Sequence, residues 1–141
     1  MNKLTLAQAD AVMTAALTHS KACGYKPMAV VVLDDAGHLV LARREDGASM
    51  FRIDIATGKA WAAAAMGVSS RALMARAKDN PNFFTALAAT AHGKFIAQTG
   101  AVPITSDRGE LLGAVGASGG TGDEDEAICI AGVRAAGLMP G

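Results

Sequence analysis

Residues 109–126 have the sequence GELLGAVGASGGTGDEDE, and this stretch decides much of the expected fold. An apolar run from Leu111 to Ala117 ends at a cluster of glycines and is followed by an acid-rich segment. Farther on, apolar residues recur at helical spacing, namely Ile128, Ile130, Val133 and Leu138. Thr121 and Glu124 have the spacing of a capping box, which marks the start of a helix. The pattern predicts a strand, a tight turn and a helix.

The glycine turn shares only some features with a phosphate-binding loop. A helix that starts after a glycine-rich turn offers free N–H groups and a positive dipole end to anions. Here the first helical turn carries acids that repel a phosphate and already satisfy the dipole, namely Asp123, Glu124, Asp125 and Glu126. No lysine follows the glycines, as a Walker loop requires, so nucleotide binding is set aside. Two interpretations stay open: a capped helix that approaches the sheet closely, or a ligand lying over Ser118, Gly119, Gly120 and Thr121.

The rest of the chain alternates helical and strand patterns. A helix begins at Leu6, after the capping-box pair Thr5 and Gln8, and Gly24 is placed to end it. The apolar run 28–33 predicts a central strand covered on both faces, and the turn at 34–37 returns the chain as a second strand. The other expected elements are helices at 51–66, 71–78 and 82–87 and short strands at 94–98 and 101–105, with Pro103 at an edge or a bulge.

Length, charge and cysteine spacing narrow the class of protein. The 141 residues suit one domain, so a single domain over residues 1–141 is expected. A formal net charge of zero excludes the electrostatic footprint of a nucleic-acid-binding or membrane-surface protein. Neither a membrane span nor a signal-peptide pattern is present, so a soluble cytoplasmic protein is expected. Cys23 and Cys129 have no metal-ligand spacing and are expected to be buried free thiols.

Small apolar side chains dominate the composition. Hydrophobic residues make up 51% of the chain but aromatic residues only 4%. Small side chains leave less apolar area per residue for a monomer core to bury, and stabilisation scales with that area. A surface buried between copies would make up the difference, so a homo-oligomer is expected.

Two residues on the helical patterns are candidates for a site. His19 flanks the apolar face of the first helix, beside Ala16 and Cys23. It is either a boundary histidine with a local hydrogen bond or an axial ligand of a metal or haem. Lys59 is the only charged residue on an alanine-rich helical face. It either extends to solvent or pairs with Asp46 or with an anionic ligand.

Several segments together resemble the GlcG/HbpS haem-binding family, which also includes the C-terminal domain of PduO-type proteins. The segments are residues 31–37, 44–48, 59–60, 102–104, 113–121 and 125–126. They follow one another in order and at family spacing over nearly the whole chain. One departure is that Gly100 is followed by Ala101, where the family commonly has paired glycines.

The resemblance implies an α/β (α+β) fold in which a five-stranded antiparallel sheet packs with helices, of the profilin-like or PAS-like kind. It also implies a homo-oligomer and, for some members, haem or corrinoid binding. Matching His19 to a histidine in the first helix of PduO-type domains makes it the candidate axial ligand. Members of the family are often encoded with catabolic enzymes.

Three functions are open at this point, and the first is preferred. The protein is a small-molecule binding protein for haem or a related tetrapyrrole, with Arg44 and Lys59 near the propionates. Alternatively, it is a cofactor-independent enzyme acting on a small carboxylated metabolite in a catabolic pathway. Arg44 would then hold the carboxylate, Lys59 or Asp46 would be acid or base, and residues 118–121 would supply N–H donors. In the third function, an accessory protein, Arg44, Asp46 and Lys59 form a structural salt-bridge network.

Overall fold

The computed structural model of the chain describes residues 3–141. The elements in chain order are α1 (Leu6–Cys23), β1 (Ala29–Asp34), β2 (Leu39–Arg44), α2 (Phe51–Met66), α3 (Ser70–Asp79), α4 (Pro81–Thr90), β3 (Ala101–Thr105), β4 (Leu111–Ser118), α5 (Gly122–Ala135) and β5 (Met139–Pro140). The strands form one antiparallel five-stranded sheet in the order β2-β1-β4-β3-β5. The expected α+β architecture with a five-stranded antiparallel sheet is confirmed.

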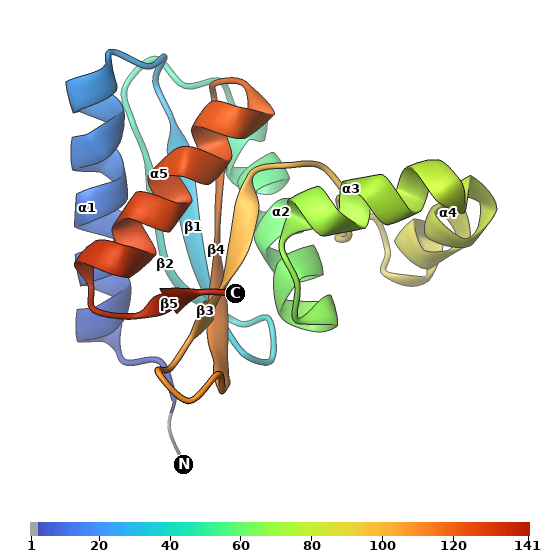
Figure 1. The fold of residues 1–141 in the computed structure, drawn as a ribbon. Coiled ribbons are helices and arrows are strands. Elements are labelled where there is room, and N and C mark those ends of the chain that lie inside the picture. Colours follow the sequence, from blue (N-terminus) through green and yellow to red (C-terminus); the bar gives the residue numbers. More distant parts are fainter. Residues whose placement is uncertain (1–2) are drawn as a thin grey trace.

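Helices cover both faces of the sheet (Figure 1). α1 and α5 pack against one face and α2 against the other. Successive residues of a strand point to opposite faces. Val30 and Val32 of β1 therefore join the core beneath α1 and α5, whereas Val31 and Leu33 pack beneath α2. All four are buried, which confirms that the apolar run forms a central strand covered on both sides.

Glycines let the helices approach one another and the sheet closely. A Cβ on Gly116 of β4 would meet the backbone of Ala56 and Ala60 in α2, and a Cβ on Gly132 of α5 would meet the backbone of Val12 in α1. A larger side chain at either glycine would push the two elements apart. The small residues thus set the spacing between the layers, as the composition indicates.

The ends of the helices follow the capping signals in the sequence. Both predicted capping boxes are present, Thr5 with Gln8 and Thr121 with Glu124. Gly24 ends α1 in a left-handed conformation. α4 is longer than the one or two turns expected. Over residues 3–141, no helix combines the length and the hydrophobicity that a membrane span requires.

Two predictions near the C-terminal half are wrong. Residues 94–98 form no strand; the Ile96 N–H donates to the Gly58 carbonyl of α2 at 3.2 Å, so this segment packs on a helix instead of joining the sheet. The last strand is β5, which pairs with the end of β3. Leu138 therefore lies outside α5, because the chain turns at Gly137, whose φ is 77°.

Pro103 lies where its missing N–H is tolerated. Its carbonyl accepts the Gly141 N–H at 3.0 Å on the side of β3 away from β4. A register shift with β4 follows between Ile104 and Thr105. The prediction of an edge or a bulge is thus close but not exact: the irregularity begins one residue after Pro103, and the proline nitrogen faces away from β4, where no ladder hydrogen bond is lost.

The two cysteines are free but differ in exposure. Cys129 of α5 is buried, as expected, and burial raises the pKa of its thiol. Cys23 is exposed, so the expectation of burial is wrong for this residue. It is the last residue of α1, beyond the part of the helix that packs on the sheet.

Candidate functional site

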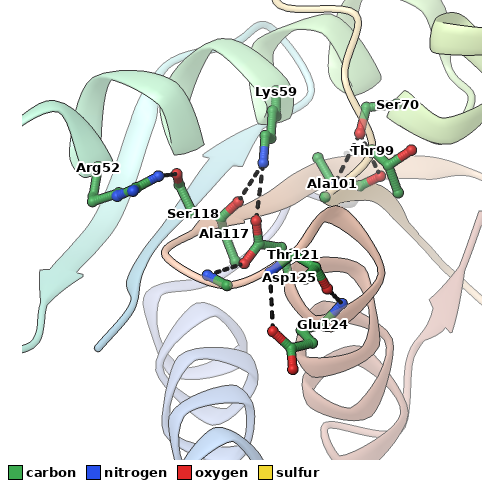
Figure 2. A network of polar contacts seen from close by, with 12 residues as sticks. Arg52, Lys59, Ser70, Thr99, Ala101, Ala117, Ser118, Thr121, Glu124 and Asp125 are labelled. Carbon is green, nitrogen blue, oxygen red and sulfur yellow. Dashed lines mark hydrogen bonds and ion pairs between the residues drawn. The ribbon is translucent and has the colours of Figure 1, made fainter. Parts of the chain in front are cut away.

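A buried ion pair joins α2 to α5 beside the glycine turn (Figure 2). Lys59 Nζ lies 3.1 Å from Asp125 Oδ2, and the two side chains are 7% and 3% exposed. Lys59 also donates to the Ala117 carbonyl of β4 at 3.2 Å. Asp125 Oδ1 accepts the backbone N–H of Gly120 at 2.9 Å. Each buried charge is therefore both paired and hydrogen-bonded, which offsets part of the cost of removing it from water.

Asp125 is the acid of the first turn of α5 that points inward. Burial raises the pKa of its carboxyl group, while the charge of Lys59, the Gly120 hydrogen bond and the charge of Arg52 act in the opposite direction. Asp123 by contrast is exposed. The acids of this turn therefore do more than repel anions, because Asp125 connects the glycine turn to α2 through its contacts with Gly120 and Lys59.

Gly100 leaves the space that the Lys59 ammonium group occupies. Its φ is 140°, and a Cβ at this position would lie 2.7 Å from Lys59 Nζ. The next residue, Ala101, begins β3, where a side chain is accommodated. Its N–H donates to Ser70 Oγ at 2.8 Å, and its carbonyl accepts from the same hydroxyl at 3.3 Å. The departure from paired glycines thus falls on a strand residue held by Ser70, whereas Gly100 itself is present beside Lys59.

A cavity of about 470 Å³ opens between α2, α3 and the start of α5. Its wall includes the charged and hydroxyl side chains Arg52, Lys59, Arg71, Ser118, Asp123 and Asp125. Arg52 Nη1 donates to Ser118 Oγ at 3.2 Å. Arg71 of α3 pairs with Asp123 and Glu126 of α5. Converging polar groups in a concave site of this size are typical of small-molecule binding.

Part of the predicted site lies in this cavity. Lys59, Ser118, Gly120 and Thr121 all belong to its wall. Gly119 does not, because its backbone packs against Pro27, whose carbonyl a Cβ at position 119 would strike. The glycine turn therefore serves in part to pack against the start of β1.

Arg44 and Asp46 lie elsewhere, in a second hollow of about 480 Å³ beside Tyr25. Arg44 Nη1 donates to the Ala48 carbonyl at 2.6 Å. Within residues 3–141, no ion pair joins Lys59 to Asp46, and none joins Arg44 to Asp46. The predicted Lys59–Asp46 pair, the three-residue network and the extension of Lys59 to solvent are therefore wrong. The sheet order explains this, because β1 separates β2, which ends at Arg44, from the end of β4 where Lys59 meets α5.

His19 lies at a third location, on α1. It is half-buried in the wall of an open hollow of about 640 Å³ between α1 and α5. Five alanines contribute to the same wall, namely Ala11, Ala15, Ala22, Ala131 and Ala135. Its Nε2 atom is 3.6 Å from Cys23 Sγ. In the part of the chain that the structure describes, no three side chains gather as a metal-binding group, so His19 is a single imidazole on a small-residue surface.

The sequence analysis missed Arg52 and Arg71 and assigned Asp125 no role in a site. A signal for Asp125 exists, because Asp125 and Lys59 both belong to the segments that carry the family resemblance. Opposite charges in a chain rich in alanine and glycine are reasonable candidates for a buried pair. Arg52 and Arg71 carry no such signal, because an arginine on an amphipathic helix is usually exposed.

A family model described as "Haem degrading protein HbpS-like" matches residues 4–134. The match covers all of the chain except its ends, and it confirms the resemblance found in the separate sequence segments. A comparison with curated proteins finds no match.

Solved structures share the fold over almost the whole chain. The crystal structure of a PduOC complex with haem is 23% identical, with a TM-score of 0.87, and the alignment covers 97% of each chain. The ORFY protein of Klebsiella pneumoniae is also 23% identical, with a TM-score of 0.87, over 97% of this chain and 93% of that chain. A double mutant of HbpS from Streptomyces reticuli is 26% identical, with a TM-score of 0.83, over 95% and 87%.

Proposed function

This chain belongs to the HbpS-like family, and we propose that it binds haem, with His19 of α1 as the axial ligand of the iron. The observation that carries the proposal is the half-buried imidazole of His19 in the open, alanine-lined hollow between α1 and α5. A similar fold is seen in the PduOC complex with haem. When bound, haem supplies an iron centre whose properties depend on its axial ligand and its surroundings.

The residues of the hollow fit a flat, largely apolar group. Alanine makes up most of the wall between α1 and α5, beside Asp10, Thr14, Thr18 and His19, and its small side chain leaves room for a planar ring. Within residues 3–141, the His19 ring has one hydrogen-bond partner, the Cys23 thiol, which is a weak donor and a weak acceptor. An imidazole without a strong internal partner is available as a ligand.

Cationic side chains lie next to this hollow and would attract the carboxylates of haem. Thr14 and Thr18 of α1 belong to the His19 hollow and also to a neighbouring one that contains Lys21, Arg43 and Arg44. Arg43 is paired with Asp10, which leaves Lys21 and Arg44 as the better candidates for the propionates. Lys59, the other predicted cation, is held by Asp125 in a different cavity and takes no part.

A haem titration of the purified apoprotein tests the proposal. Absorbance across the Soret region is expected to show saturable one-to-one binding, and His19→Ala is expected to shift the band and weaken binding. His92→Ala is the matched control, because His92 is an exposed histidine after α4 and far along the chain from α1. A titration without any saturable Soret change refutes haem binding. An identical band in His19→Ala removes His19 as the ligand.

We also propose that the protein is a homo-oligomer. α4 has no buried residue although it contains Phe83, Phe84 and Leu87, and Phe83 is 51% exposed. In Figure 1, α3 and α4 extend away from the sheet. Phe84 and Leu87 pack in part on the chain's own core, so Phe83 is the apolar side chain of α4 that is left exposed, and an exposed aromatic residue is typical of a contact between copies. Light scattering is expected to give a multiple of the 14.3 kDa chain mass, reduced in Phe83→Asp; a monomer mass at micromolar concentration would exclude the oligomer.

The alternative function, an enzyme or accessory protein for a small carboxylated metabolite, is less well supported in its predicted form. Arg44 and Asp46 are separated from Lys59, so they do not form one catalytic group with it. The cytoplasmic location and the link to catabolism stay predictions.

A further inference from the structure

Within residues 3–141, Arg52 forms no ion pair with a carboxylate, although it lines a cavity whose other cations are paired. Lys59 is held by Asp125, and Arg71 by Asp123 and Glu126. Arg52 takes part in no ion pair within residues 3–141, and its single hydrogen bond goes to Ser118 Oγ. A half-buried guanidinium with most of its N–H donors unused is suited to bind an anion.

The position of Arg52 on its helix is electrostatically unfavourable, and Asp125, the carboxylate on which its charge acts, is already paired with Lys59. It is the second residue of α2. The N-terminus of a helix carries a partial positive charge, so a cation there is disfavoured and a nearby anion is favoured. Asp54 is in the same turn but two residues away, on a different side of the helix, and is exposed. An anion in the cavity would therefore compensate both Arg52 and the helix end.

Two further donors surround the place that such an anion would occupy. Ser118 is 1% exposed, and its oxygen accepts from Arg52, so its own O–H remains available. Lys59 Nζ has three N–H donors and uses two of them, for Ala117 and Asp125. Figure 2 shows the Arg52 side chain directed at Ser118, with Lys59 about two turns farther along α2.

The remaining groups of the cavity argue against a phosphate. Three N–H groups around the start of α5 are already used: Gly120 donates to Asp125, Thr121 to Glu124, and Glu124 to Thr121. The carboxylates of Asp123 and Asp125 also line the cavity and would repel a dianion. One guanidinium that forms no ion pair within residues 3–141, beside two carboxylates, is suited to a group with a single negative charge.

The rest of the wall favours an organic molecule with an uncharged polar portion. Ile55 and Met74 are apolar, and Gln98 and Thr99 offer neutral hydrogen-bonding groups. The volume of about 470 Å³ suits a small molecule. We propose that this cavity binds a small organic monocarboxylate, anchored by Arg52 and assisted by Ser118 and Lys59. This site is separate from the His19 hollow and does not depend on haem.

NMR titration of the full chain tests this site with defined probes. Acetate, lactate and benzoate serve as carboxylates, and inorganic phosphate as the competing anion, each at millimolar concentrations. At least one carboxylate is expected to shift the amide resonances of Gly120, Thr121 and Thr99 saturably. Arg52→Gln is expected to weaken that binding by about tenfold or more, because it removes a charge-assisted hydrogen bond. Arg108→Gln is the matched control, since Arg108 is exposed in the turn before β4, at the end of that strand away from Ser118.

Each outcome either supports or overturns the site. The proposal is overturned if none of the three carboxylates shifts these amides saturably, if Arg52→Gln binds as well as the unchanged chain, or if phosphate binds more tightly than every carboxylate. Arg52 is half-buried, so we expect Arg52→Gln to fold, and the amide spectrum of the variant shows whether it does. Repeating the titration in His19→Ala separates this site from the haem proposal, because carboxylate binding is expected to be unchanged there.

Discussion

Replacing Lys59 by methionine removes the cation of the buried pair while keeping a side chain of similar length. The Asp125 side chain, which is only 3% exposed, then keeps the Gly120 N–H as its one hydrogen-bond partner within residues 3–141. Breaking a buried pair in this way costs about 3–5 kcal/mol of unfolding free energy. A domain of this size is stable by about 5–15 kcal/mol, so we expect a loss of roughly a fifth or more of the total. With a urea m-value near 2 kcal/mol/M, the midpoint should fall by roughly 1.5–2.5 M.

The loss in Lys59→Met should depend on pH in a defined direction. The pKa of Asp125 in the folded protein is raised above its reference value of 3.8. A carboxyl group with a raised folded pKa favours folding most below its unfolded pKa, and this contribution is lost as the pH rises through the folded pKa. Removing Lys59 also removes the charge that opposes the raised pKa, so protonation of Asp125 should relieve the variant at acidic pH. The destabilisation should therefore be smaller at about pH 5 than at about pH 8.

Urea unfolding monitored by circular dichroism, at fixed protein concentration, measures both effects. Lys94→Met is the matched control, because Lys94 is exposed, and it should change stability by less than about 0.5 kcal/mol. The double variant Lys59→Met/Asp125→Asn should recover part of the loss, with a coupling of about 0.5–3 kcal/mol. A cost below about 1 kcal/mol for Lys59→Met, or an equal cost at both pH values, would refute the reasoning that the pair is buried and charged.

Three further predictions concern other parts of the chain. Partial burial raises the pKa of the Asp34 carboxyl group, but hydrogen bonds from His38 and the turn backbone outweigh this effect and lower the pKa below 3.8. Asp34→Ala should therefore lower the unfolding free energy by about 1–2 kcal/mol at neutral pH, as measured by urea unfolding. The difference in stability between the variant and the unchanged chain should vanish as the pH falls through the folded pKa of Asp34. A chromogenic thiol reagent should label Cys23 in the native protein and Cys129 only after denaturation, and rapid labelling of both would show that α5 opens readily. Gly116→Ala places a Cβ against the backbone of α2 and should cost about 1–3 kcal/mol, whereas unchanged stability would mean that α2 shifts freely.

Much of the fold was predictable because it depends on local patterns. The capping pairs at Thr5 and Thr121 mark the starts of α1 and α5 whatever surrounds them, because the partners lie three residues away. The apolar run of β1 predicts burial on both faces. Residues 94–98 were misassigned because their apolar residues are buried against α2, and burial alone does not distinguish a strand from a packed loop.

The candidate site was predictable only in part. Lys59 and residues 118–121 were identified, and most of them line the same cavity. Arg44 and Asp46 were grouped with Lys59 because the family segments follow one another in the sequence, yet the strand order separates them. Arg52 was missed because its unpaired state depends on which acids α5 directs to Lys59 and Arg71.

By itself, the sequence determined the family, the helix starts and the two-sided burial of the central strand, because these depend on residue types at short separations. Only the tertiary structure decided which charges meet. Lys59 and Asp125 are 66 residues apart in the chain, and their pairing follows from α2 and α5 lying next to the same end of β4. In the same packing, Arg52 forms no ion pair with any carboxylate of residues 3–141. Electrostatic partners act over a few ångströms of space, so they are settled by the packing of elements and not by the order of residues.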